Sequence, residues 1–134
     1  MKKNGILNSD ISRVLSYMGH TDCIAIGDCG LPIPEEVERI DLALKFGEPS
    51  FMTTLETVVG DMKVERIVLA EEIKEQNKEV LEQIEALFAG QDIEIEYVPH
   101  IEFKKQTYEC KAVIRTGETT PYANIILQSG CIFA

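Results

Sequence analysis

Apolar residues recur at helical spacing in three stretches of the chain. In the first, four apolar residues spaced three and four apart define one buried face: Ile11, Val14, Leu15 and Met18. Asn8 or Ser9 can cap this helix at its start, and Gly19 fits the position that ends it. The same spacing predicts a helix that begins after Ser50 and another over residues 71–90, and a shorter helix is predicted over residues 100–110.

Short apolar runs between these helices predict strands. The runs cover residues 23–27, 64–70, 93–98, 111–117 and 124–130, and residues 37–44 alternate more weakly. Nearly continuous apolar runs such as "CIAI" are typical of strands that are covered on both faces. Helices that alternate with such strands predict an α/β fold of three layers, in which a mostly parallel sheet carries helices on both faces. The length of 134 residues favours a single domain over residues 1–134.

Composition and charge narrow the possible partners. Hydrophobic residues make up 45% of the chain and charged residues 27%, which is ordinary for a globular protein. The net charge of −10 should repel phosphate groups, so nucleic acid and anionic membranes are not expected partners. The chain has neither a signal-peptide pattern nor an apolar run of the roughly 20 residues that a spanning helix needs. We therefore expect a soluble, cytoplasmic protein.

Several classes of chemistry lack their sequence motifs. The chain contains no Walker A phosphate loop, no G-x-G-x-x-G after a strand and no G-x-S-x-G elbow. Two histidines and four cysteines without a C-x-x-C pair do not predict a metal site, and the cysteines are best interpreted as small buried residues. The functions that remain possible are proton transfer without a metal and simple binding of a ligand.

Polar residues flank the predicted strand 23–27 at both ends. His20 follows the first helix, and histidine is the side chain best suited to proton transfer near neutral pH. A structural alternative is that His20 only caps that helix. Asp28 follows the strand, at the edge where open α/β sheets bind ligands. Its structural alternative is an Asx-turn.

Two later clusters carry groups suited to binding hydroxyls. His100 and Lys104 are four residues apart and share a helix face, although an amphipathic surface helix, taken alone, explains them better. Tyr122 and Asn124 lie in a turn marked by glycine and proline between two apolar strands. Tyrosine offers an apolar ring with a polar tip, and asparagine both donates and accepts.

The spacing of His20 and Asp28 poses a geometric problem. A strand rises ~3.3 Å per residue, so the two side chains of one chain should lie ~20 Å or more apart. One sugar ring cannot contact both. Either one of them is structural, or the strand is shorter, or a neighbouring subunit brings the two ends together.

The ordered motifs as a set resemble the ribose pyranase/fucose mutarotase family. They are "LNSDIS", "GHTD", "DCGLPIP", "RIDLAL", "AEEIK", "H-x-x-F-K" and "VIRTGE…PYANIIL". The resemblance covers essentially the whole chain, and the Asp-x-Gly-Leu-Pro and Pro-Tyr-Ala-Asn segments look like the ribose branch. Cys29 departs from the alanine expected there, which is a small-for-small change.

The resemblance implies a function and a set of site residues. The implied reaction is the interconversion of β-pyranose and β-furanose D-ribose, without cofactor or metal, in ribose utilisation. The implied catalytic acid is His20, and the implied sugar contacts are Asp28, His100, Lys104, Tyr122, Ala123 and Asn124. The resemblance also implies a ring-shaped homo-oligomer, a decamer in this family, with sites at subunit contacts.

Two other functions are compatible with the same residues. One is a sugar-binding accessory or regulatory subunit of ribose uptake that catalyses nothing. The other is mutarotase activity on another sugar.

Overall fold

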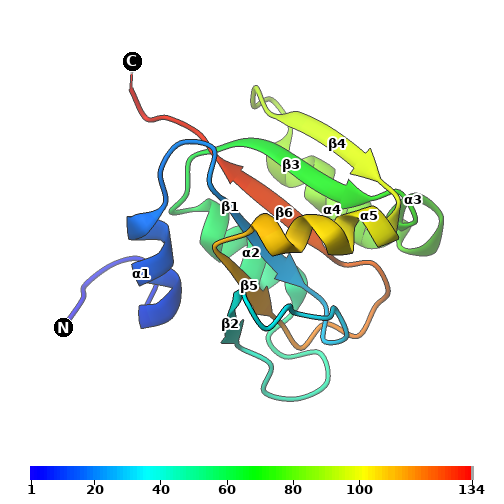
Figure 1. The fold of residues 1–134 in the computed structure, drawn as a ribbon, viewed down its shortest axis with the longest axis horizontal. Coiled ribbons are helices and arrows are strands. Elements are labelled where there is room, and N and C mark those ends of the chain that lie inside the picture. The colour runs from blue at the N-terminus through cyan, green and yellow to red at the C-terminus, as the bar shows by residue number, and fades with distance from the viewer. Residues whose placement is uncertain (134) are drawn as a thin grey trace.

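The computed structural model describes residues 1–133. Its helices are α1 (Ser9–Tyr17), α2 (Phe51–Val59), α3 (Ile73–Gln76), α4 (Lys78–Phe88), α5 (His100–Gln106) and the short 3₁₀ helix η1 (Thr107–Glu109). Its strands are β1 (Cys23–Gly27), β2 (Glu38–Asp41), β3 (Val64–Ala70), β4 (Glu94–Val98), β5 (Ala112–Arg115) and β6 (Ile125–Ser129). Figure 1 shows how these elements are arranged.

The six strands form one sheet in the order β2-β5-β1-β6-β3-β4. Five of them run in the same direction, and only β6, between β1 and β3, is antiparallel to its neighbours. The predicted mostly parallel sheet is therefore confirmed. Because β6 is reversed, its first residues lie beside the carboxyl end of β1, and its last residues lie beside the amino end of β1.

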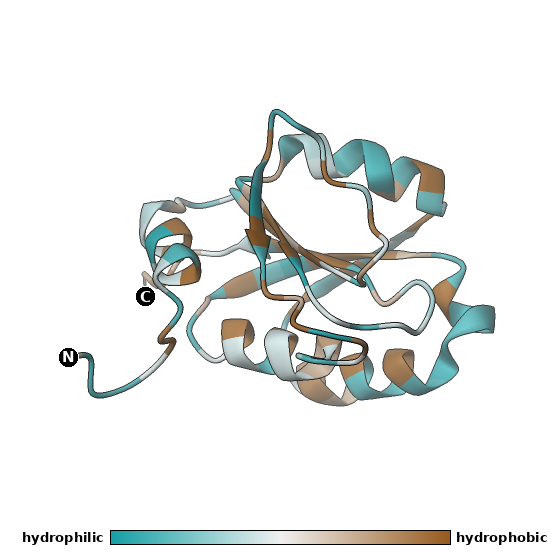
Figure 2. Cartoon of the chain, turned by 90° about the horizontal axis from the view of Figure 1, so that it is seen from below, coloured by the Kyte–Doolittle hydropathy of each residue, from teal (hydrophilic) through white to brown (hydrophobic). Residues whose placement is uncertain are grey.

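Helices cover both faces of the sheet, as predicted, and each face has its own apolar core (Figure 2). In one core, the helices α1, α2, α3 and α4 pack on alternate strand residues such as Ile24 and Ile26. In the other core, Phe103 of α5 belongs to the same apolar cluster as Ala25 of β1. Successive strand residues point to opposite faces, so β1 contributes to both cores. The continuous apolar pattern of residues 23–27 follows from this burial on both sides.

The helix predicted over residues 71–90 is interrupted, and this part of the prediction is wrong. The structure has α3 and α4 there, separated by Asn77, whose backbone leaves the helical region at φ −152° and ψ 63°. The Asn77 side chain accepts from Val80 N and so caps α4. Asparagine competes well for this role, because its side chain satisfies a free N–H at a helix start.

Other boundaries differ by a few residues. The predicted strands at 37–44, 111–117 and 124–130 shorten to β2, β5 and β6, and the predicted helix at 100–110 ends as η1. Asn8 and Ser50 cap α1 and α2 through their side chains, as the sequence predicts. The part of the chain that the structure describes has no helix long and apolar enough to cross a membrane.

Candidate functional site

Asp28 and Asn124 form a reciprocal pair at the carboxyl edge of the sheet. Asn124 accepts from the backbone N of Asp28 at 2.9 Å through Oδ1, and its Nδ2 donates to Asp28 Oδ2 at 3.2 Å. The two residues are 96 positions apart and meet because β6 starts where β1 ends. Asp28 Oδ1 also accepts from Gly30 N at 2.9 Å, so the predicted Asx-turn is present together with the cluster.

His100 and Tyr122 lie against each other at the same edge. Their rings meet edge-to-face with centroids 5.1 Å apart, and the His100 ring stacks on Phe103 at 6.2 Å. The His100 backbone N donates to the Glu72 carboxylate at 3.0 and 3.1 Å. Among the described residues, His100 Nδ1 is a buried polar atom without a hydrogen-bond partner, which is unusual and points to a ligand. Tyr122 has φ +56°, a conformation uncommon outside glycine.

The cluster shifts the ionisation of two groups. Burial raises the pKa of Asp28 above its usual value, although hydrogen bonds from Gly30 and Asn124 oppose the shift. Burial lowers the pKa of His100, and the nearby positive charge of Lys104 lowers it further. Both effects favour the uncharged forms. A neutral imidazole beside a partly buried carboxyl group suits hydrogen bonding to the hydroxyls of an uncharged sugar.

Lys104 and Ala123 occupy different positions around this cluster. Lys104 lines a groove of about 350 Å³ with neighbours that include Pro32, Ile101 and Tyr108. Ala123 is completely buried in the core, so in the single chain neither its side chain nor its backbone is exposed. The structure thus brings Asp28, His100, Tyr122 and Asn124 to one edge. Ala123 lies between two of them in sequence, and Lys104 is near enough for its charge to act on His100.

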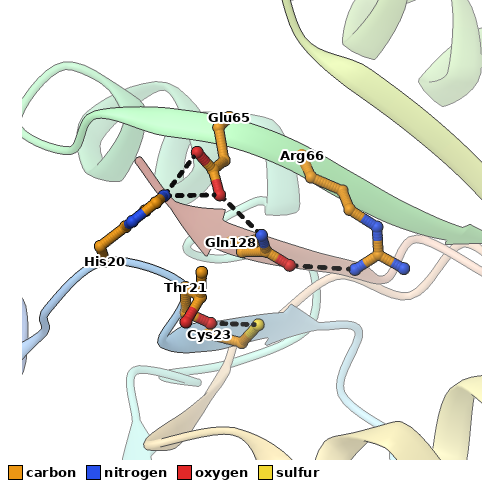
Figure 3. Close-up of polar contacts among 6 residues, drawn as sticks. All are labelled: His20, Thr21, Cys23, Glu65, Arg66 and Gln128. Atoms are coloured by element: carbon orange, nitrogen blue, oxygen red, sulfur yellow. Dashed lines mark hydrogen bonds and ion pairs between the residues drawn. The ribbon is translucent and has the colours of Figure 1, made fainter. Parts of the chain in front are cut away.

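His20 lies at the opposite edge, before the amino end of β1. Its Nε2 is 3.0 and 3.1 Å from the two carboxylate oxygens of Glu65 (Figure 3). Because a carboxylate can only accept a hydrogen bond, Nε2 is the nitrogen that donates to Glu65. The other ring nitrogen, Nδ1, is not engaged by Glu65. Glu65 also accepts from Gln128 Nε2 at 2.8 Å, and both contacts lower the pKa of Glu65, the one with Gln128 more strongly. Gln128 in turn accepts from Arg66 at 3.2 Å.

The surroundings of His20 are open to solvent. The His20 side chain is 51% exposed and lines a groove of about 560 Å³ whose wall includes Met18, Lys63 and Phe133. Thr21, which follows it, has φ +73°, a strained value for a β-branched residue. The separation of His20 and Asp28 at opposite ends of β1 agrees with the strand arithmetic.

Sequence reasoning missed the residues that contact His20 and His100. Glu65 is 45 positions from His20, and Glu72 is 28 positions from His100. Both stand beside other charged residues and look like solvated surface, so only the folded structure identifies them. No cluster of three or more potential metal ligands occurs among residues 1–133.

The family model described as "RbsD / FucU transport protein family" matches residues 1–132. The chain belongs to this family. Two relatives named D-ribose pyranase are those of Geobacillus thermodenitrificans, 58% identical over the full length of both chains, and of Halalkalibacterium halodurans, 56% identical over 99% of this chain and all of that one.

Solved structures of family members share the fold. Bacillus subtilis RbsD complexed with D-ribose is 53% identical, with a TM-score of 0.95 over 99% of this chain and all of that one. The fucose mutarotase of Streptococcus pneumoniae in complex with L-fucose has a TM-score of 0.81 over 95% of each chain, at 21% identity. The latter likeness extends to the fold alone.

Proposed function

We propose that residues 1–134 form a single ribose pyranase-like domain that interconverts the β-pyranose and β-furanose forms of D-ribose. The full-length similarity to D-ribose pyranases gives the reaction, which is an isomerisation. The observation that carries the proposal is the meeting of Asp28, His100, Tyr122 and Asn124 at one sheet edge, with an unpartnered imidazole nitrogen. The reaction changes no oxidation state, so it needs no redox cofactor.

The carboxyl-edge cluster is the proposed sugar-binding half of the site. Asp28 and Asn124 present carboxyl and amide groups to ring hydroxyls, and neutral His100 offers a nitrogen. Tyr122 supplies an apolar ring face with a polar tip. The ammonium group of Lys104 is a further proposed contact, and Ala123, buried in the single chain, is one by family resemblance.

His20 is the proposed catalytic acid. Opening the pyranose requires a proton on the ring oxygen and the loss of one from the anomeric hydroxyl. The open aldehyde then rotates, and its 4-hydroxyl attacks C1 to close the furanose. Glu65 holds the Nε2–H of His20, so the doubly protonated ring donates its second proton, on Nδ1, to the ring oxygen, and Nδ1 takes up the proton that the anomeric hydroxyl loses. Such general acid–base catalysis contributes ~10²–10⁴-fold.

A neighbouring subunit completes the site in this proposal. His20 and the sugar-binding cluster face opposite ends of β1, so one sugar reaches both only if His20 comes from another chain. Large exposed apolar side chains support an assembly that covers them: Leu44, Phe46, Ile101, Tyr108, Ile132 and Phe133. We expect a ring-type homo-oligomer, a decamer by family resemblance, that serves ribose utilisation in the cytoplasm.

NMR exchange spectroscopy on ¹³C-labelled ribose tests the function. Added protein should raise the pyranose–furanose exchange rate of D-ribose more than that of L-fucose or other sugars in a panel. Binding of ribose without faster exchange would instead indicate a non-catalytic accessory subunit. Faster exchange of another sugar alone would indicate a different mutarotase.

A further inference from the structure

The interruption between α3 and α4 lies at the sheet edge that carries the sugar-binding cluster. In Figure 1, α3 sits where β3 and β4 end. Its chain leaves the helical conformation at Asn77, which is 8% exposed and thus a buried polar residue. A buried amide is normally hydrogen-bonded, so the partners of the Asn77 side chain show which part of the chain it fixes.

The Asn77 amide contacts the loop that leads to Tyr122. Its Nδ2 donates to Pro121 O at 2.8 Å and to Thr120 Oγ1 at 2.9 Å, and its Oδ1 accepts from Val80 N at 3.4 Å. The orientation of the amide is fixed chemically, because a carbonyl oxygen can only accept. One side chain therefore caps α4 and holds a loop 44 positions away.

The held peptide unit is the one that precedes Tyr122. Fixing the Pro121 carbonyl fixes the plane of the Pro121–Tyr122 peptide, and Tyr122 then adopts its uncommon φ of +56°. The carbonyl of Tyr122 accepts from Asn124 N at 2.9 Å, so the turn continues directly into the residue that pairs with Asp28. A strained conformation of this kind persists only where its surroundings enforce it.

The same short segment holds the other sugar-binding loop. Glu72, directly before α3, binds the backbone N of His100, and the His100 ring packs edge-to-face on Tyr122. Residues 72–77 thus connect the loop of His100 to the loop of Tyr122. An uninterrupted helix over residues 71–90 would keep Asn77 in helical geometry and could not provide this connection.

We propose that Asn77 is a positioning residue for sugar binding, which sets the backbone of Thr120–Tyr122 through its amide. This inference rests on the proposed sugar-binding role of the cluster. Asn77 touches no sugar in this account and acts through Tyr122 and Asn124. Its loss should weaken ribose binding and leave the proton-transfer step of His20 unchanged, because His20 lies at the opposite edge.

Replacing Asn77 with Asp separates the two roles of the side chain. Aspartate remains a good helix cap, so α4 should keep its start. It has no N–H to donate, and its carboxylate faces the Pro121 carbonyl. We expect the Kd and the KM for ribose to rise about five- to tenfold, the effect of one neutral hydrogen bond or slightly more, with kcat unchanged.

Asn8→Asp is the matched control. Asn8 caps α1 by accepting from Ile11 N at 2.9 Å, and the replacement makes the same chemical change at a helix start away from the loop. The control should keep wild-type Kd, KM and kcat. Asn77→Asp should have the lower Tm, because two buried hydrogen bonds are lost, but both variants should stay folded at the assay temperature, which excludes unfolding as the cause of weaker binding.

Ribose titrations followed by NMR, together with exchange rates, decide the outcome. A wild-type Kd in Asn77→Asp, or a fall in kcat at constant KM, would overturn the role of Asn77. If Asn77→Asp does not fold, Thr120→Val removes the hydroxyl partner from the loop side, and an unchanged Kd there would overturn it equally. A wild-type chain that binds ribose without faster exchange would refute the proposed catalysis alone, and the titrations would still test Asn77.

Discussion

At the residue scale, the two ends of β1 differ in exposure: His20 lies at an exposed end, and His100 and Asp28 lie at a partly buried one. At the amino edge of β1, His20 is exposed and paired with the Glu65 carboxylate. At the carboxyl edge, burial favours neutral His100 and raises the pKa of Asp28. In the proposed mechanism, the exposed His20 transfers protons and the neutral His100 binds, and both roles are compatible with an uncharged sugar.

Glu65→Gln tests whether Glu65 orients His20. The amide keeps the shape but replaces a charge-assisted contact with a neutral one and can present an N–H to Nε2. Because the pair is half exposed, we expect kcat for ribose exchange to fall about three- to tenfold with little change in KM. Glu82→Gln, on the exposed face of α4, is the control. An unchanged kcat would remove Glu65 from the mechanism.

The lowered pKa of His100 predicts a pH dependence of stability. The folded state binds the proton of His100 less readily than the unfolded state does, so folding loses stability as the pH falls from the ordinary value near 6.5 through the lowered one. The shift at Asp28 has the opposite sign, since a raised carboxyl pKa costs stability as the pH rises from 3.8.

Thermal unfolding between pH 5 and pH 7 isolates the contribution of His100. The Tm of the wild type should fall more steeply towards pH 5 than the Tm of His100→Gln, which has no group titrating at that position. The difference between the two curves cancels most of the contribution of Asp28. Parallel curves would show that burial of the ring does not control its ionisation.

At the scale of elements, strand β1 determines the layout of the whole site. The strand itself and the caps of α1 and α2 can be predicted from the sequence, because local spacing and capping residues determine them. The antiparallel direction of β6 cannot be predicted in this way. That direction brings Asn124 to Asp28 and Gln128 to Glu65.

The interruption at Asn77 shows a second limit of sequence reasoning. Apolar residues continue at helical spacing from Ile73 to Phe88, so the periodic pattern alone predicts one helix. The break depends on partners in a loop more than 40 positions away, which local propensity does not report. Asparagine is a good helix cap, and that was the available signal. The residues of the proposed site were predicted individually. The residues that contact them were not: Glu65 beside His20, Glu72 at His100, and Asn77 at the loop before Tyr122.

Gly27→Ala tests the close packing at the end of β1. A Cβ atom there would lie 2.6 Å from a side-chain carbon of Leu31 and 3.0 Å from Asn124 Oδ1. Both neighbours must move, so we expect a loss of about 1–3 kcal/mol in the free energy of unfolding and a higher KM for ribose. Urea unfolding and exchange kinetics measure the two effects.

Gly19→Ala is the control for that substitution. Its added Cβ would meet nothing closer than Asp22 Oδ2 at 3.8 Å, an ordinary contact. The free energy of unfolding should therefore stay within about 0.5 kcal/mol of wild type. Equal losses in both variants would mean that packing at the Asn124 amide does not limit this strand end.

At the scale of the whole molecule, the proposed site requires an assembly of several chains. One chain presents the proposed catalytic acid, His20, at one edge of its sheet and the proposed sugar-binding cluster at the other. A ring, in which the His20 edge of each chain meets the cluster of the next, gives every sugar both halves. The exposed apolar residues near both edges, among them Ile101 and Phe133, are candidates for the contact surfaces.

Subunit complementation tests this central claim most directly. His20→Ala should retain ribose binding and lose most exchange, and Asp28→Ala should lose ribose binding. When equal amounts of the two variants are co-expressed and purified together, shared sites predict about a quarter of the wild-type exchange rate, because random pairing restores that share of intact sites. An exchange rate no higher than the mean of the two variants alone would show that each chain builds its own site, and would contradict the account.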